Sequence, residues 1–139
     1  MPTPDFAQVA GLLRVALTQH ASEAGTRRAL PTLMHVGTPG VEEVVVPEGP
    51  GLDPGLRADL MERALDGLDL DRTPVPWITR TGELSPGDVD FAWFAASREA
   101  FGRHSLELPG FFVMTRYGWL DLTTEELIRW SRIRRSKRA

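Results

Sequence analysis

Two short segments of the chain combine a strand-like apolar run with side chains that could bind an anion. The sequence Trp-Ile-Thr-Arg-Thr-Gly is echoed further along by Val-Met-Thr-Arg-Tyr-Gly, which gives two Thr-Arg pairs, Thr79 with Arg80 and Thr115 with Arg116. Arginine binds phosphate or carboxylate through parallel N–H donors. If the two strands are parallel, both pairs lie at the carboxyl edge of the sheet, where open α/β sheets bind ligands. These four residues are the predicted ligand-binding site. The alternative is that each arginine only lies along a strand end while the glycine turns the chain.

The three histidines, His20, His35 and His104, are the other groups suited to acid–base chemistry. Glu42 and Glu43 follow His35 across a predicted turn, so these residues form the only acid–base cluster that the sequence suggests. Structural roles are the more common interpretation for all three histidines. No histidine has the short spacing to another ligand that a zinc site shows, so the sequence predicts no metal.

Several kinds of chemistry are excluded by residue usage. Cysteine is absent, which removes disulfides, thiolate metal sites and thiol nucleophiles. Lys137 is the only lysine and lies near the end of the chain, which argues against Schiff-base chemistry and a P-loop. The glycine-rich segments match no dinucleotide-binding pattern, and no serine lies in a Gly-x-Ser-x-Gly elbow. The sequence therefore predicts no cofactor and argues against an enzyme rather than for one.

Length and composition are those of an ordinary globular domain. The chain has 139 residues, of which 42% are hydrophobic and 25% are charged. We expect a single α/β domain over 1–135 and a frayed basic tail over 136–139. The abundance of Arg, Ala, Gly and Pro indicates a bacterial origin. No stretch has the roughly 18 consecutive apolar residues of a membrane span, and the start lacks the regions of a secretory signal, so a cytoplasmic location is expected.

Hydrophobic periodicity and helix-breaking residues define the elements that must position these groups. The pattern predicts helices near 4–23, 53–67, 85–103 and 123–135, and strands near 31–36, 41–46, 75–80 and 111–116. The first two strands should form an antiparallel hairpin, and the unit over 75–116 should be a right-handed parallel crossover. The third helix is apolar on several sides and is expected to be buried on more than one. The predicted fold is α/β, a single domain with a mixed sheet of about four strands packed with about four helices.

The last part of the chain resembles a known class of domain. Residues 118–124, 126–128 and 132–135 are similar to the closing strand and helix of some small bacterial endonuclease-like domains. The resemblance implies a strand followed by a helix in this region. It does not extend to nuclease activity, because those domains need an acid and an acid-x-lysine motif on adjoining strands, and that pattern is missing here.

Three functional hypotheses follow. The sequence favours a non-catalytic protein-interaction or regulatory module, whose partner is another protein or a second copy in a homodimer, because no nucleophile and base converge. The alternative is a small-molecule or anion-binding enzyme that uses Arg80 and Arg116. The second alternative is a nucleic-acid-associated protein that uses the basic C-terminal segment. All 19 acidic residues precede residue 129, so binding through that segment would be weak and sensitive to salt.

Overall fold

The computed structural model describes residues 6–24 and 30–129 as an α/β domain with one mixed sheet. The elements follow in the order α1 (Phe6–Ala24), β1 (Leu33–Thr38), β2 (Glu42–Pro47), α2 (Pro54–Asp66), β3 (Val75–Thr79), α3 (Asp88–Arg103), β4 (Phe112–Thr115), β5 (Gly118–Asp121) and β6 (Glu126–Arg129). The strand order is β2-β1-β3-β4-β5-β6. Strands β3 and β4 are parallel, and all other neighbours are antiparallel. The predicted hairpin and the predicted parallel βαβ unit are both confirmed.

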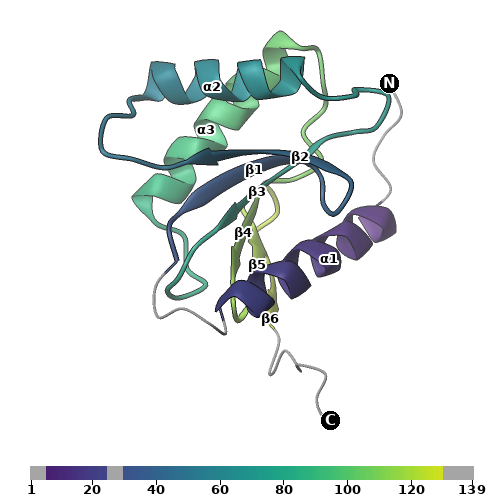
Figure 1. The fold of residues 1–139 in the computed structure, drawn as a ribbon, viewed down its shortest axis with the longest axis vertical. Coiled ribbons are helices and arrows are strands. Elements are labelled where there is room, and N and C mark those ends of the chain that lie inside the picture. Colours follow the sequence, from purple (N-terminus) through teal and green to yellow (C-terminus); the bar gives the residue numbers. More distant parts are fainter. Residues whose placement is uncertain (1–5, 25–29, 130–139) are drawn as a thin grey trace.

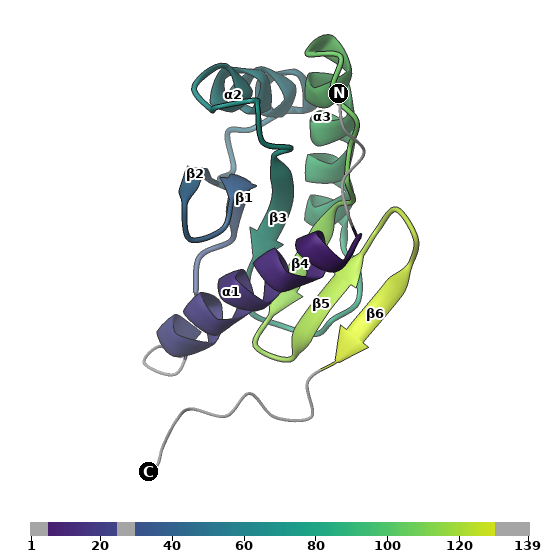
Figure 2. The same cartoon turned by 90° about the vertical axis from the view of Figure 1, so that its right-hand side faces the viewer.

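Two layers of helix cover the sheet unequally. Helices α2 and α3 pack side by side on one face, whereas α1 alone crosses the other face (Figures 1 and 2). The core under α2 and α3 includes Met34, Ile78 and Val113, and the core under α1 includes Trp77 and Met114. Because successive residues of a strand point to opposite faces, neighbouring residues contribute to different cores. Among the described residues, one helix covers the α1 face of the sheet and two helices cover the other.

Helix α2 begins where the sequence predicts. The side chain of Asp53 accepts a hydrogen bond from the backbone N–H of Leu56 at 2.8 Å, and Pro54 occupies the first helical turn. This arrangement satisfies one of the backbone donors that a helix leaves unpaired at its start. Helix α2 packs along α3, and the two are tied to β2 through Glu48, which accepts hydrogen bonds from Arg57 and Trp93.

The predictions for α3 need two corrections. The helix is predicted to begin at residue 85, but Ser85 lies outside it, and the helix begins at Asp88 after the N-cap Gly87. The helix is also not buried on several sides, because Phe91 is 50% exposed while Trp93 is completely buried. The Asp90 carboxylate accepts the backbone N–H of the N-cap residue Gly87 at 2.8 Å, which is the reciprocal hydrogen bond that an acid three residues after the N-cap makes at a helix start.

The predicted numbers of strands and helices are wrong, because the structure has six strands and three helices among the described residues. The region predicted as a fourth helix, and implied as one by the endonuclease-like resemblance, forms a turn and then β6 up to Arg129. Thr123 does not cap a helix, since its hydroxyl donates to Asp121 at 2.7 Å and its N–H donates to the same carboxylate oxygen at 2.9 Å. Strand β5, which pairs with both β4 and β6, is absent from the four strands that the hydrophobic pattern predicts, although the endonuclease-like resemblance implies a strand in this region.

The predicted basic tail over 136–139 lies outside the described residues, as does most of the basic C-terminal segment.

None of the described helices has both the length and the apolar character required to cross a membrane.

Candidate acid–base site at His35

Three adjacent strands bring one histidine, one glutamate and one threonine together on the α1 face of the sheet. In the antiparallel register, His35 of β1 lies opposite Val45 of β2 and opposite Trp77 of β3. Glu43 is two residues from Val45, and Thr79 is two residues from Trp77, so both occupy diagonal positions relative to His35. Diagonal neighbours on one face of a sheet lie within reach of long side chains. The pleat alone therefore directs all three polar side chains to one place.

Both ring nitrogens of His35 have polar partners. The Nδ1 atom lies 3.1 Å from Oε1 of Glu43, and the Nε2 atom lies 2.8 Å from Oγ1 of Thr79. The ring is stacked on Trp77 with the ring centroids 4.8 Å apart and the planes 9° apart. A stacked ring with a contact at each nitrogen has little freedom to rotate. The imidazole is therefore held in one orientation.

The electrostatics of this cluster favour a charged Glu43. A hydrogen bond from His35 lowers the pKa of the Glu43 carboxyl below its ordinary value, against the opposing effect of burial. Glu43 is therefore a carboxylate at neutral pH and can only accept a hydrogen bond, which places a proton on Nδ1 of His35. In the neutral ring, Nε2 is then the acceptor for the Thr79 hydroxyl.

Gly37 makes room for this arrangement. It lies directly opposite Glu43 in the β1–β2 pair, with a φ of +140°. A Cβ at this position would lie 2.2 Å from the backbone carbonyl oxygen of Glu42. No other residue type fits such a position without moving the backbone. The glycine thus lets β2 approach β1 closely where the carboxylate reaches diagonally to the histidine.

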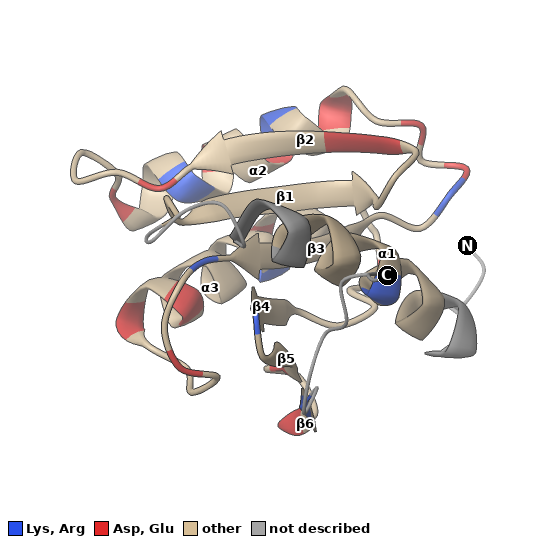
Figure 3. Cartoon of the chain, turned by 60° about the horizontal axis from the view of Figure 1, so that its bottom comes forward, with Lys and Arg blue, Asp and Glu red and all other residues tan. Residues whose placement is uncertain are grey.

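A small cavity of about 80 Å³ lies beside the cluster. It is bounded by the second half of α1, the start of β1 and the end of β3; its lining includes Gln19, His20, Leu33, His35, Glu43 and Thr79. Thr79 is the last residue of β3, so the cavity lies at the carboxyl end of one strand of the parallel pair. The beginning of β2 at this site is acidic, as the red segment in Figure 3 shows.

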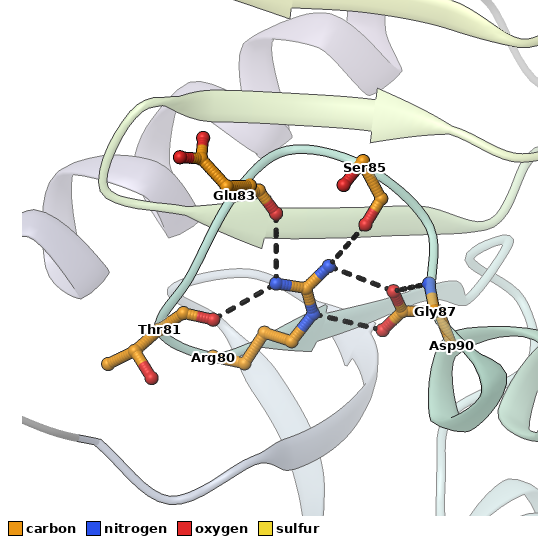
Figure 4. A network of polar contacts seen from close by, with 6 residues as sticks. All are labelled: Arg80, Thr81, Glu83, Ser85, Gly87 and Asp90. Atoms are coloured by element: carbon orange, nitrogen blue, oxygen red, sulfur yellow. Dashed lines mark hydrogen bonds and ion pairs between the residues drawn. The ribbon is translucent and has the colours of Figure 1, made fainter.

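Arg80, one of the predicted anion-binding residues, has all of its guanidinium donors engaged inside the protein (Figure 4). Its Nε and Nη2 atoms form a bidentate pair with the Asp90 carboxylate at 3.1 and 2.9 Å. The backbone carbonyl oxygens of Thr81, Glu83 and Ser85 accept the remaining N–H groups. Asp90 is 1% exposed, so this pair ties the end of β3 to the start of α3.

The four residues predicted to bind a ligand do not meet at one point. Thr79 lies on the α1 face and lines the cavity, whereas Arg80 turns toward α3. The Thr115 hydroxyl is buried and accepts the N–H of Tyr117 at 3.1 Å, and the Arg116 guanidinium lies over the Tyr117 ring. Anion binding by these arginines stays a prediction. Of the four, Thr79 is the one that the structure joins to the acid–base cluster.

Sequence reasoning identified parts of this site separately. It singled out His35 with Glu42 and Glu43, and it singled out Thr79 on other grounds. Glu42 points elsewhere, and its carboxylate accepts the backbone N–H of Asp69 at 2.8 Å. The role of Trp77 as the surface on which His35 stacks was missed. Its position two residues before Thr79 in a β-strand was the available signal, because such residues share a face.

The fold and the site together define a class: an α/β domain with a mixed six-stranded sheet and a histidine-centred polar cluster on the face that carries one helix. Among the described residues, no group of three histidine, aspartate or glutamate side chains could hold a metal ion. Comparison of the chain with known protein families, with curated proteins and with solved structures finds no match.

Proposed function

We propose that the chain is a small-molecule enzyme in which His35 performs acid–base chemistry at the cavity beside α1. The observation that carries the proposal is the bridge from the Thr79 hydroxyl through the His35 ring to the Glu43 carboxylate, at 2.8 and 3.1 Å. Enzymes orient a histidine base with a carboxylate on one nitrogen and place the group that gives up its proton at the other. A histidine with only a packing role needs no cavity at this point.

The proposal keeps the class of the small-molecule enzyme that the sequence suggested as an alternative, but its centre is different. The proposed functional residues are His35 and Thr79 instead of the two arginines of that hypothesis. The N–H groups of Arg80 already donate to Asp90 and to backbone carbonyl oxygens. The lining of the cavity combines polar groups with apolar residues such as Leu33 and Trp77. That combination is typical of sites that bind small organic molecules.

Ligand binding can be tested by observing the histidine ring nitrogens by NMR in the full chain. We expect acetate or acetamide to shift the ring signals of His35 saturably, because each is small enough for the cavity. His104 serves as the internal control, since it pairs with Asp66 at 3.0 Å outside the cavity. Binding should persist in His104→Asn. If neither probe shifts His35 at high millimolar concentration, the proposal is wrong. Inorganic phosphate that shifts only the Arg80 and Arg116 side-chain signals would support the anion hypothesis instead.

The interaction hypothesis has one specific observation in its favour, the exposure of β6. This strand ends the sheet, and all four of its residues are exposed, with Leu127 at 42% and Ile128 at 45%. Adjacent strand residues point to opposite faces, so apolar side chains are uncovered on both sides of the sheet edge. A second copy that extends the sheet edge to edge about a two-fold axis would cover both.

Self-association through β6 predicts a dimer mass in light scattering at micromolar concentration. Ile128→Lys should convert the dimer to a monomer, because a charge on the strand face opposes edge pairing. Val41→Lys is the matched control, since Val41 is 64% exposed in the turn between β1 and β2, at the other end of the sheet. A monomeric wild-type chain at all concentrations would reject the hypothesis.

A further inference from the structure

The hydroxyl of Thr79 is the group that the His35 cluster is built to activate. It approaches Nε2 of His35 at 2.8 Å, and the residue lines the cavity although its surface is 6% exposed. A threonine hydroxyl carries one proton and two lone pairs. When it donates to Nε2, its lone pairs are free to attack an electrophile. Thr79 as nucleophile, His35 as base and Glu43 as the carboxylate that orients the base are therefore hydrogen-bonded in the order that covalent catalysis by a hydroxyl requires.

We propose, resting on the proposed function, that Thr79 is a nucleophile that takes the acyl group from small carboxylic esters. The Thr79 oxygen bonds to the ester carbonyl carbon while its proton passes to Nε2 of His35. The bond to the alkoxy oxygen then breaks, and the alcohol leaves with that proton. Water attacks the acyl-threonine, gives a proton to the same nitrogen, and releases the carboxylic acid as Thr79 regains its hydrogen. The net reaction is hydrolysis of the ester.

The remaining groups at the site suit this chemistry. Glu43 contacts Nδ1 of His35, the ring nitrogen that faces away from Thr79, so it is a positioning residue that holds the ring and stabilises the imidazolium form. Gln19 of α1 lines the same cavity and brings an amide N–H, the type of donor that stabilises an oxyanion.

The cavity limits the size of the acyl group. Its volume of about 80 Å³ is about half of the roughly 150 Å³ cavity that accommodates benzene. An acetyl or propionyl group fits such a space, whereas a long acyl chain does not. The geometry therefore selects esters of short carboxylic acids, with the alcohol part outside the cavity.

The direct test is incubation of the full chain with 4-nitrophenyl acetate, followed by intact-mass and peptide mass spectrometry. We expect one acetyl group on Thr79 and release of nitrophenol. Thr79→Val, which keeps the shape of the side chain, should abolish both, and Thr79→Ser should restore them. His35→Asn should slow acylation about a hundredfold or more. The corresponding octanoate ester should react much more slowly than the acetate.

Thr115→Val is the matched control, because Thr115 is also a buried threonine at the end of the neighbouring strand, but its hydroxyl accepts a backbone N–H. It should leave acylation unchanged. Acetyl groups found only on Lys137, on the N-terminus or on His35 itself, or acylation that survives Thr79→Val, would overturn the proposal. If acetate or acetamide binds at His35 yet Thr79 is never acylated, the nucleophile assignment fails while the proposed function stands. If no probe binds and no acylation occurs, both are wrong.

Discussion

Replacing Asp90 with alanine should lower the free energy of unfolding by about 3 to 5 kcal/mol. Asp90 is 1% exposed and forms the bidentate pair with Arg80 while also accepting the Gly87 N–H. The substitution leaves a largely buried guanidinium without its counter-charge and removes the cap of α3. Chemical denaturation followed by circular dichroism measures the change directly. The melting temperature should fall by roughly 10 °C or more for a chain of this size.

Two comparisons separate this effect from a general loss of packing. In a double-mutant cycle, Arg80→Met should offset part of the cost of Asp90→Ala, because the unpaired charge is then absent. Arg103→Gln removes an arginine that pairs with Asp59, Glu62 and Glu99 on the exposed surface, and it should leave the melting temperature nearly unchanged. Equal effects for Asp90→Ala and Arg103→Gln would show that burial of the first pair has no energetic consequence.

The second large effect is expected for Gly118→Ala, with a cost of more than about 2 kcal/mol. Gly118 begins β5 with a φ of +141°, and a Cβ there would lie 2.0 Å from the backbone carbonyl oxygen of Ile128. The alanine must therefore push β6 away from β5 as well as adopt a strained backbone. Denaturation measures the loss of stability, and amide hydrogen exchange should show lost protection across the β5–β6 pair.

Gly102→Ala provides the opposite expectation within the same chain. Gly102 lies in α3, and a Cβ built there meets nothing within 4 Å. Alanine in a helix is favoured over glycine by about 0.5 to 1 kcal/mol, so this variant should be more stable than the wild type. If Gly118→Ala were as stable as Gly102→Ala, that result would contradict the close approach of β6 to Gly118.

The elements with strong local signals were predictable from the sequence. Asp53 and Pro54 predict the start of α2. The order strand, helix, strand over residues 75–115 predicts the parallel pair β3 and β4. These signals are local, because a cap or a proline acts on the residues next to it. They also explain why the fold class was correct.

The errors come from short segments in which tertiary contacts outweigh local preference. Thr123 followed by Glu126 has the residue types of a capping box. Asp121, only two residues earlier, captures the threonine hydroxyl and directs the chain into a turn. Strands of four residues such as β5 and β6 carry too few positions for a periodic pattern to be recognised.

The candidate site was only half predictable for a similar reason. His35 and Thr79 were both noticed, but the pairing of β1 with β3 was not, because all of α2 separates the two strands along the chain. Arg80 was expected to face a ligand on the strength of its residue type. Nothing in the sequence marks Asp90 as the acceptor that engages Arg80, since no local pattern distinguishes a buried aspartate from an exposed one.

The consecutive residues Thr79 and Arg80 face opposite sides of the sheet, and this has a consequence for how the chain can change over generations. One of them borders the cavity, and the other fastens α3. Substitution at one position leaves the other residue in place, so each can vary on its own. Deletion of a single residue within β3 would bring Arg80 into the position beside His35, and insertion of one would bring Thr79 into the position opposite Asp90. The cluster at His35 and the anchoring of α3 therefore both depend on the register of β3. We expect β3 to tolerate point substitutions far better than changes in its length.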